Sequence, residues 1–539
     1  MTSFTGGLPT LISASRVHTG TGPAEALLVR DGRVADHGRA AELRRRYPGA
    51  ATLDLPELTV TAGLTDAHVH LVEWALARGQ PALRGADSPA AAVAAVVEHI
   101  RVHGARGWVR GRGWDPNPWT EAPHRRLLDD ALGQVPVALE SHDMHSYWAS
   151  SAALRMAGID AATADPEGGR IERDADGEPT GVLRDNAIPL LLDAIPPYTD
   201  ADRREALMEA QAALHRMGVT GVHTVEPDSL GLLERVRADD ALRLRVLQHL
   251  SLARLDDAIR LGVRSGFGGP WLRIGGVKMF LDGALGSRTA WLRAPYEGTD
   301  DRGIATMEPD AFRDAVRRGA AAGLATTVHA IGDAAMDLAL ETLAVDGEAL
   351  DGPIPHRIEH AQLMAPDQLG RDRARDGSGE PGGAGTPDAA ARVVLSVQPC
   401  HLMTDWRAAD RHWGDRARHA FALRSMEAAG YTLALGSDAP VEPPDPRLGL
   451  WAAVARRDLD GAPEGGWRPD EAVSMERAWA GYTTGAARAA GDARQGRLVP
   501  GSFADLVAWG RDPLAAEPDD LLDLEPVLTM VDGEVVWRA

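Results

Sequence analysis

Eight short apolar runs recur through the middle of the chain, and each gives way to polar residues before a stretch of helical composition. Short strands that alternate with helices are typical of parallel α/β folds, and eight such units predict a (β/α)8 barrel of the TIM type. Such barrels carry their chemistry at the carboxyl ends of the strands, so the polar residues that end the runs should meet at one mouth. The predicted strands cover residues 59–70, 219–226, 244–250, 272–280, 325–330, 357–360, 393–398 and 432–437.

Both ends of the chain predict strands without intervening long helices. Apolar runs flank Asp31-Gly32 near the start and Asp532-Gly533 near the end, and Asp-Gly between apolar runs indicates a hairpin. We expect a composite β-sandwich domain from residues 1–61 and 490–539, around a barrel of residues 62–489. Two insertions interrupt this barrel: an α/β subdomain at about residues 75–205 and a Gly-, Asp-, Arg- and Pro-rich flexible loop at 371–390.

Composition excludes several classes of protein. With 44% hydrophobic and 25% charged residues among 539, the chain has a globular balance. Its net charge of −21 leaves no basic surplus for phosphates, which disfavours nucleic-acid binding. The apolar runs are too short for a membrane span, no secretory signal is recognisable, and the single cysteine fits a reducing compartment. We expect a cytoplasmic protein that acts on a small molecule, with a homodimer as one possible assembly.

The distribution of basic residues singles out one position. Of the 57 basic residues 56 are arginine, and Lys278 is the one lysine. A GC-rich coding bias explains the excess of arginine, and chance survival of one lysine is the alternative explanation. Guanidinium stays protonated, whereas a lysine amine can lose its proton and react. Lys278, near the end of the predicted strand 272–280, is therefore a candidate functional residue.

Histidines and an aspartate follow the same pattern at other strand ends. The first predicted strand ends in His68-Val69-His70, and residues two apart on a strand face one side, so both imidazoles can meet one metal ion. Alone, this pair is more commonly explained by two structural histidines. His329, His360 and Asp438 end three further strands and would converge with it. Imidazole and carboxylate are suitable ligands for zinc or a similar divalent ion.

The stretches that hold these residues resemble the amidohydrolase superfamily of metal-dependent barrels, in particular the branch with N-substituted formamide deformylase and related uncharacterised metal-dependent hydrolases. A terminal segment at 496–507 resembles the superfamily's usual return into its small β domain. The matching stretches, in the family's order, are AGLTDAHVH (62–70), GVKMFLDGALGSRTA (276–290), HAIGD (329–333), HRIEHAQ (356–362) and GSDAPV (436–441).

The resemblance implies a metal site and a reaction. His68, His70 and Asp438 would hold one divalent ion, His329 and His360 a second, and a carbamate formed on Lys278 would bridge them; one or two ions are expected, zinc before others. A metal lowers the pKa of its bound water to about 7. Asp438 would take the proton of that water and pass it to the leaving amine. The expected reaction is hydrolysis of a non-peptide C–N bond in an amide, formamide or cyclic amide.

Substrate contacts are predicted at three positions: Trp114, His145 and Arg288. The first two lie in GWD and DMHSYW, which resemble family segments of the inserted region, although Met144 replaces the usual glycine before the histidine. A structural histidine and a surface ion pair are the alternatives for His145 and Arg288. The roles of three further histidines at strand ends stay open: His223, His249 and His401.

Two other functions remain open at this point. A lyase or isomerase could use the same metal site, and only hydrolysis would place solvent oxygen in an acid product. A non-catalytic binding or regulatory protein could retain the barrel, because a fold does not fix a function. The complete set of candidate ligands argues against this last possibility.

Overall fold

The structure, a computed structural model, describes residues 8–104, 107–116, 119–141, 146–166, 169–227, 229–345, 352, 354–369 and 393–539. The predicted flexible loop 371–390 lies outside these ranges. The chain divides into two compact units, Ala75–Leu207 and the remainder, Met1–Trp74 with Met208–Ala539. The helices α2 (Leu71–Arg78) and α7 (Asp200–Arg216) carry the chain from one unit to the other.

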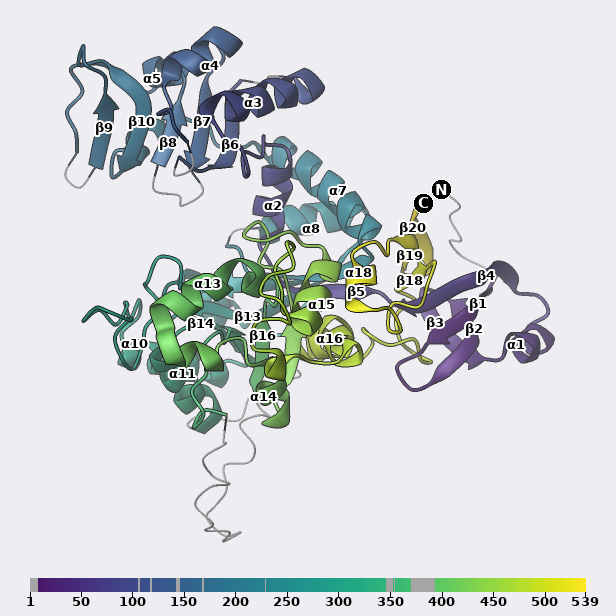
Figure 1. Ribbon diagram of the computed structural model, residues 1–539. Coiled ribbons are helices and arrows are strands. Elements are labelled where there is room, and N and C mark those ends of the chain that lie inside the picture. The colour runs from purple at the N-terminus through teal and green to yellow at the C-terminus, as the bar shows by residue number, and fades with distance from the viewer. Residues whose placement is uncertain are drawn as a thin grey trace. The chain divides into compact units, whose positions relative to one another are not determined.

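Parallel strands in the larger unit confirm the predicted barrel (Figure 1). Within the described residues the sheet has eight strands in the order β17-β16-β15-β14-β13-β12-β11-β5, so strands that neighbour one another in the sequence also pair in space. This order brings every strand's carboxyl end to one mouth. The strands are β5 (Leu64–Val69), β11 (Val219–Thr224), β12 (Arg245–Ser251), β13 (Leu272–Phe280), β14 (Thr326–Ala330), β15 (His356–His360), β16 (Val393–Val397) and β17 (Thr432–Leu435).

One predicted strand divides into two. Residues 59–70 contribute the end of β4 (Ala51–Ala62) to the terminal sheet and all of β5 to the barrel. Gly63 separates them at a close approach: a Cβ atom there would lie 2.2 Å from the Thr220 hydroxyl oxygen. The junction between the two sheets therefore has no room for a side chain.

The barrel closes through the loop that follows β17. The strands β5 and β17 end the hydrogen-bonded order, and a parallel bridge joins Val69 to Ala439 between them. The backbone N–H of Asp438 donates to the His68 carbonyl at 2.7 Å, and that of His70 donates to the Ala439 carbonyl at 2.9 Å. The closure thus places Asp438 against the two histidines at the end of β5.

Helices cover the barrel because their apolar residues recur at helical spacing. In α10, Pro309 stands at the start and Phe312, Val316 and Gly319 are buried on one face. Phe312 packs into one core with Val277 of β13, and burying each such side chain contributes about 1.5–3 kcal/mol. The helices of this unit that follow α7 are α8 (Leu230–Ala238), α9 (Leu255–Leu261), α10 (Pro309–Ala321), α11 (Asp333–Leu340), α13 (His401–Trp413), α14 (Leu423–Ala428), α15 (Pro446–Ala455), α16 (Met475–Ala480), α17 (Ala486–Ala489) and α18 (Pro518–Leu521).

Strands from both termini form one sheet, in the order β20-β19-β18-β4-β1-β2-β3. Leu27 of β2 and Leu528 of β19 share one core although three strands separate them in this order, so the sheet curls over its own apolar face. A single curled sheet therefore provides the packing of a small β-sandwich. Its remaining elements are β1 (Thr10–His18), β2 (Pro23–Arg30), β3 (Arg33–Gly38), α1 (Ala40–Arg46), β18 (Leu506–Trp509), β19 (Pro526–Val531) and β20 (Glu534–Arg538).

The unit Ala75–Leu207 has a mixed sheet of its own, ordered β6-β7-β8-β10-β9, in which β6 and β7 run parallel and the other pairs antiparallel. Trp114, Trp119 and Trp148 pack together in its core. Its elements are α3 (Pro89–His103), β6 (Val109–Trp114), α4 (Arg125–Leu132), β7 (Val137–Ser141), β8 (Ser146–Ala149), α5 (Ser151–Met156), β9 (Gly169–Arg173), β10 (Pro179–Asp185) and α6 (Ile188–Leu192).

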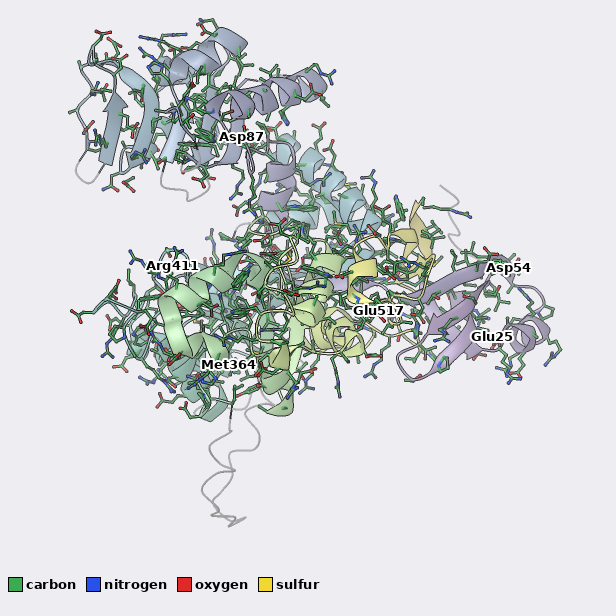
Figure 2. The ribbon with its side chains drawn as sticks, in the orientation of Figure 1. Glu25, Asp54, Asp87, Met364, Arg411 and Glu517 are labelled. Atoms are coloured by element: carbon green, nitrogen blue, oxygen red, sulfur yellow. The ribbon has the colours of Figure 1, made fainter. Side chains whose placement is uncertain are left out.

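The charged residues labelled Glu25, Asp54, Arg411 and Glu517 are exposed, whereas Met364 is buried (Figure 2). Within the described ranges every helix is too short or too polar to span a lipid bilayer.

Candidate active site

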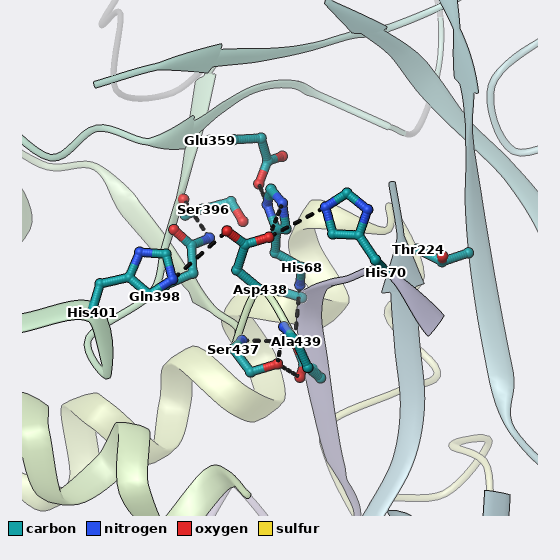
Figure 3. A network of polar contacts seen from close by, with 12 residues as sticks. His68, His70, Thr224, Glu359, Ser396, Gln398, His401, Ser437, Asp438 and Ala439 are labelled. Carbon is teal, nitrogen blue, oxygen red and sulfur yellow. Dashed lines mark hydrogen bonds and ion pairs between the residues drawn. The ribbon is translucent and has the colours of Figure 1, made fainter. Parts of the chain in front are cut away.

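Asp438 and two histidines meet where the barrel closes (Figure 3). His68 Nε2 lies 3.2 Å from Asp438 Oδ1, and His70 Nε2 lies 3.4 Å from the same oxygen. His68 and Asp438 are buried, and His70 is partly exposed. The structure therefore brings both members of the His-x-His pair to one carboxylate oxygen.

His360 and His329 complete the histidine cluster. Ligand atoms of His68, His360 and Asp438 all lie within 4.8 Å of one another. The His329 ring centroid is 4.4 Å from that of His360. The Nε2–H of His329 can donate to the Gly283 carbonyl at 3.1 Å, and in that tautomer the ring lone pair is on Nδ1. Four predicted histidines and Asp438 thus form one contiguous group.

Two of these residues have a strained backbone. His360 has a φ of 71° and Asp438 a φ of 61°, in the left-handed region that favours glycine. Such a conformation costs about 1–3 kcal/mol and is typical of functional sites. Neighbouring residues of a regular strand face opposite sides, yet Glu359 and His360 both contact His68. The left-handed turn at His360 accounts for this double contact.

Burial keeps two of the imidazoles neutral. Desolvation lowers the pKa of His329 to about 3 and holds the pKa of His360 well below its ordinary value. Burial would raise the pKa of Asp438, but the neighbouring His68 and His70 hold it well below its usual range. Neutral imidazoles and an ionised carboxylate are the forms in which these side chains bind metals.

The cluster has the donor set of a cation site. Glu359 Oε2 lies 2.5 Å from His68 Nδ1, so that nitrogen carries the proton. Either a second proton or a cation must then lie between His68 Nε2 and the Asp438 carboxylate. Burial would lower the pKa of His68, but the charges of Glu359 and Asp438 raise it, and the same field attracts a metal ion. The buried Nδ1 of His360 has no hydrogen-bond partner among the described residues. A divalent metal ion fits these residues.

Lys278 lies in the same mouth, on β13. Its side chain is buried, and its Nζ is 4.8 Å from the centroid of the Phe280 ring, which is itself 5.4 Å from the His329 ring. Desolvation lowers the pKa of Lys278 to about 8. Near neutral pH the Lys278 amine is therefore unprotonated more often than an ordinary lysine amine, and carbamate formation requires the unprotonated form.

The predicted substrate contacts have different outcomes. Trp114 is fully buried: its solvent exposure is 0%, its indole N–H donates to the Leu139 carbonyl at 2.8 Å, and its ring stacks on Trp119. The predicted substrate contact of Trp114 is therefore not supported. Arg288 is exposed and has a φ of 56°. His145 lies outside the described residues.

His401, at the start of α13, also belongs to the group. Its Nε2 lies 3.7 Å from Asp438 Oδ2, is buried and has no hydrogen-bond partner in the described part of the chain. Its ring stacks against His360 at 6.0 Å. Its place just after the predicted strand 393–398 was the available signal.

Asp282 is a site residue that the sequence reasoning missed. Its carboxylate accepts hydrogen bonds from the backbone N–H groups of Trp291, Ile331 and Gly332 and lies 3.5 Å from His329 Nε2. Burial raises its pKa to about 7. Asp282 therefore ties the loops after β13 and β14 together beside His329. Its position shortly after the end of predicted strand 272–280 was the signal.

A second missed group lies deeper in the barrel. Arg357, fully buried, donates to His223 Nδ1 at 2.9 Å and approaches His249 Nε2 at 3.3 Å. Both histidines therefore face the interior guanidinium, and desolvation holds the pKa of each well below its ordinary value. Arg357 also forms an ion pair with Glu359, 2.9 Å apart.

Comparisons with known proteins agree with this geometry. The model of the "Amidohydrolase family" matches residues 51–537, and an "Imidazolonepropionase-like composite domain, bacteria" matches residues 26–50. The amidohydrolase YtcJ of Bacillus subtilis (strain 168) is 30% identical, covering 95% of this chain and 96% of its own. The N-substituted formamide deformylase of Arthrobacter pascens is 30% identical, covering 95% and 94%.

Among solved structures, an uncharacterized metal-dependent hydrolase from Pyrococcus horikoshii OT3 superposes with a TM-score of 0.77 at 26% identity, covering 95% of this chain and 99% of that one. The family match spans the barrel strands, the histidine cluster and four of the seven strands of the terminal sheet, β4, β18, β19 and β20. The chain belongs to the amidohydrolase family of metal-dependent hydrolases.

Proposed function

We propose that this enzyme hydrolyses a non-peptide C–N bond in an amide, a formamide or a cyclic amide. The convergence of His68, His360 and Asp438, with ligand atoms within 4.8 Å, is the observation that carries the proposal. The name of the Arthrobacter pascens relative, a deformylase of N-substituted formamides, supports the substrate class. Water and an amide give a carboxylic acid and an amine.

The proposed metal is zinc, as one or two ions. His68, His70 and Asp438 would hold one ion, and His329 and His360 would hold the other. When bound, the metal would polarise a substrate carbonyl and lower the pKa of water at the site. The protein supplies buried neutral imidazoles, which bind a divalent cation without first losing a proton.

Asp438 is proposed as the group that moves the proton. Its Oδ1 faces His68 and His70, whereas Oδ2 lies toward His401, 3.7 Å away (Figure 3). Oδ2 can accept a proton from the attacking water and pass it to the nitrogen of the leaving amine. The backbone hydrogen bond from Asp438 to His68 holds the carboxylate in place for both transfers.

Lys278 is proposed to carry a carbamate. Its unprotonated amine would attack carbon dioxide, forming an N–C bond and releasing one proton, and the product is an anion with two oxygen ligands. The burial of Lys278 in the same mouth as the histidines supports this proposal, as does its being the one lysine of the chain.

Metal analysis followed by a substrate screen tests the function. Purified enzyme should contain zinc or a similar ion in near-stoichiometric amount, and the screen should cover formamides, N-acyl amines and cyclic amides. Reaction in ¹⁸O-labelled water should place the label in the acid product. A product formed without solvent oxygen would instead indicate a lyase or an isomerase.

We further propose a cytoplasmic location and a homodimer. A single buried thiol, Cys400, supports a reducing compartment. Cell fractionation tests the location. Sedimentation velocity tests the assembly, since a species of twice 57.3 kDa supports the dimer and one of 57.3 kDa excludes it.

A further inference from the structure

A buried ion pair lies directly behind the proposed metal site. Arg357 and Glu359 stand on β15, and both side chains are 0% exposed. Removing a charge from water costs several kcal/mol unless partners compensate for it. Arg357 has such partners, since its guanidinium donates to the Ala67 carbonyl at 2.6 Å and to the Ser396 hydroxyl at 2.9 Å in addition to its contacts with Glu359 and the interior histidines.

The two oxygens of Glu359 have different partners. Oε1 lies 2.9 Å from Arg357 Nη2, and Oε2 lies 2.5 Å from His68 Nδ1 (Figure 3 shows the second contact). A carboxylate only accepts hydrogen bonds, so His68 must donate from Nδ1. The His68 ring then presents Nε2, and not Nδ1, toward Asp438.

We propose that Glu359 is a positioning residue that fixes the tautomer and ring orientation of His68 so that Nε2 faces the metal, with Arg357 holding Glu359 in place. Glu359 acts through His68 and does not touch the substrate. This inference rests on the proposed metal site. An oriented imidazole with a carboxylate behind it binds a metal more tightly, and loss of such a partner typically costs 10–100-fold in affinity.

A purely structural ion pair would behave differently. It needs a negative charge beside Arg357 but has no requirement for an oxygen at His68 Nδ1. Glu359→Asp separates the two roles, because it keeps the charge while one methylene less draws the oxygen away from His68. Glu359→Gln keeps the length and removes the charge.

Zinc affinity of the metal-free protein is the first measurement, made by competition with a chromogenic chelator. We expect Glu359→Asp and Glu359→Gln to bind zinc about 10–100-fold more weakly than wild type. The matched control is Asp505→Asn, which disrupts another buried carboxylate, paired with Arg245 at 2.9 Å. It should lower the thermal midpoint and leave zinc affinity unchanged.

The second measurement is the rate at which the Nδ1 proton of His68 exchanges with solvent. If Glu359 had only a structural role, this rate would be the same in wild type and in Glu359→Asp. In the zinc-loaded wild type, ¹⁵N-NMR should show a slowly exchanging Nδ1–H signal that is missing from His68→Gln. In Glu359→Asp this proton should exchange faster although the protein stays folded. If Glu359→Gln fails to fold, Glu359→Asp alone decides.

The outcomes separate the two proposals. Wild type that binds no zinc would remove the metal site and the proposed function together. Suppose instead that wild type and Glu359→Asp bind zinc with equal affinity and that the His68 Nδ1 proton exchanges at the same rate in both. This result would overturn the role of Glu359 and leave the proposed function intact.

Discussion

Asp66 on the first barrel strand binds Ser437 at the end of the last, accepting hydrogen bonds from its backbone N–H at 3.0 Å and from its hydroxyl at 2.5 Å. The same carboxylate accepts the His68 N–H at 3.0 Å. Asp66 thereby joins β5 to the loop that carries Asp438. The closure of the barrel and the geometry of the proposed metal site depend on the same side chain.

Removing this carboxylate should affect stability and metal binding together. Asp66→Ala leaves buried N–H groups of His68 and Ser437 without acceptors, at about 1–3 kcal/mol each. We expect a lower thermal midpoint of the metal-free protein and weaker zinc binding. An unchanged midpoint by calorimetry would contradict the role of Asp66 in closure.

Asp438→Asn should retain metal and lose turnover. The amide still offers an oxygen ligand but cannot accept a proton, and loss of a general acid–base group commonly costs about 10²–10⁴-fold in rate. Metal content measured beside the rate is the control. A metal-replete variant with nearly wild-type turnover would remove Asp438 from proton transfer.

Lys278 variants test the carbamate. Lys278→Arg should be inactive because guanidinium keeps its charge. Lys278→Ala should lose metal and regain part of its activity with added short carboxylic acids. Carbon-13 NMR with labelled bicarbonate should show one carbamate signal in wild type, since only the α-amine competes with this single lysine. An active Lys278→Arg would dismiss the carbamate.

The strands and the histidine cluster were predictable because their signals are local. An apolar run that ends in a polar residue indicates a barrel strand, and His68, His329, His360 and Asp438 all stand at such ends. Trp114 was predicted from the resemblance of GWD to a family segment, whereas its burial depends on contacts with Trp119 and Trp148 that no local pattern reveals.

Glu359 and Arg357 were not predicted as site residues for a related reason. HRIEH places Arg357 and Glu359 two residues apart at the end of a predicted strand, and the structure shows that every residue of this strand is buried. Their partners, however, come from strands distant in the sequence: His68 lies 291 residues from Glu359, and His223 lies 134 residues from Arg357. Only the closed barrel brings them together.

His215 should make stability depend on pH. Burial lowers its pKa to about 4, and its Nε2–H donates to the Arg243 carbonyl at 2.8 Å. In the unfolded chain the His215 imidazole is protonated below about pH 6.5, whereas in the folded chain it stays neutral down to about pH 4. The contribution of His215 to the free energy of unfolding is therefore complete above about pH 6.5 and is lost as the pH falls toward 4. Between pH 7 and pH 5 this residue should account for a loss of about 2 kcal/mol.

Thermal midpoints at both pH values check this prediction. His215→Gln should show a smaller fall in thermal midpoint between pH 7 and pH 5 than wild type. If the thermal midpoint fell equally in wild type and in His215→Gln, His215 would have the same pKa in the folded and the unfolded chain, and the prediction would be wrong.

The metal site is the central claim, and anomalous X-ray scattering from crystals of the zinc-loaded enzyme tests it most directly. Data collected on both sides of the zinc absorption edge should give a peak about 2.0–2.2 Å from His68 Nε2 and from a carboxylate oxygen of Asp438. No peak among His68, His360 and Asp438, in a protein whose solution zinc content is also negligible, would contradict the account.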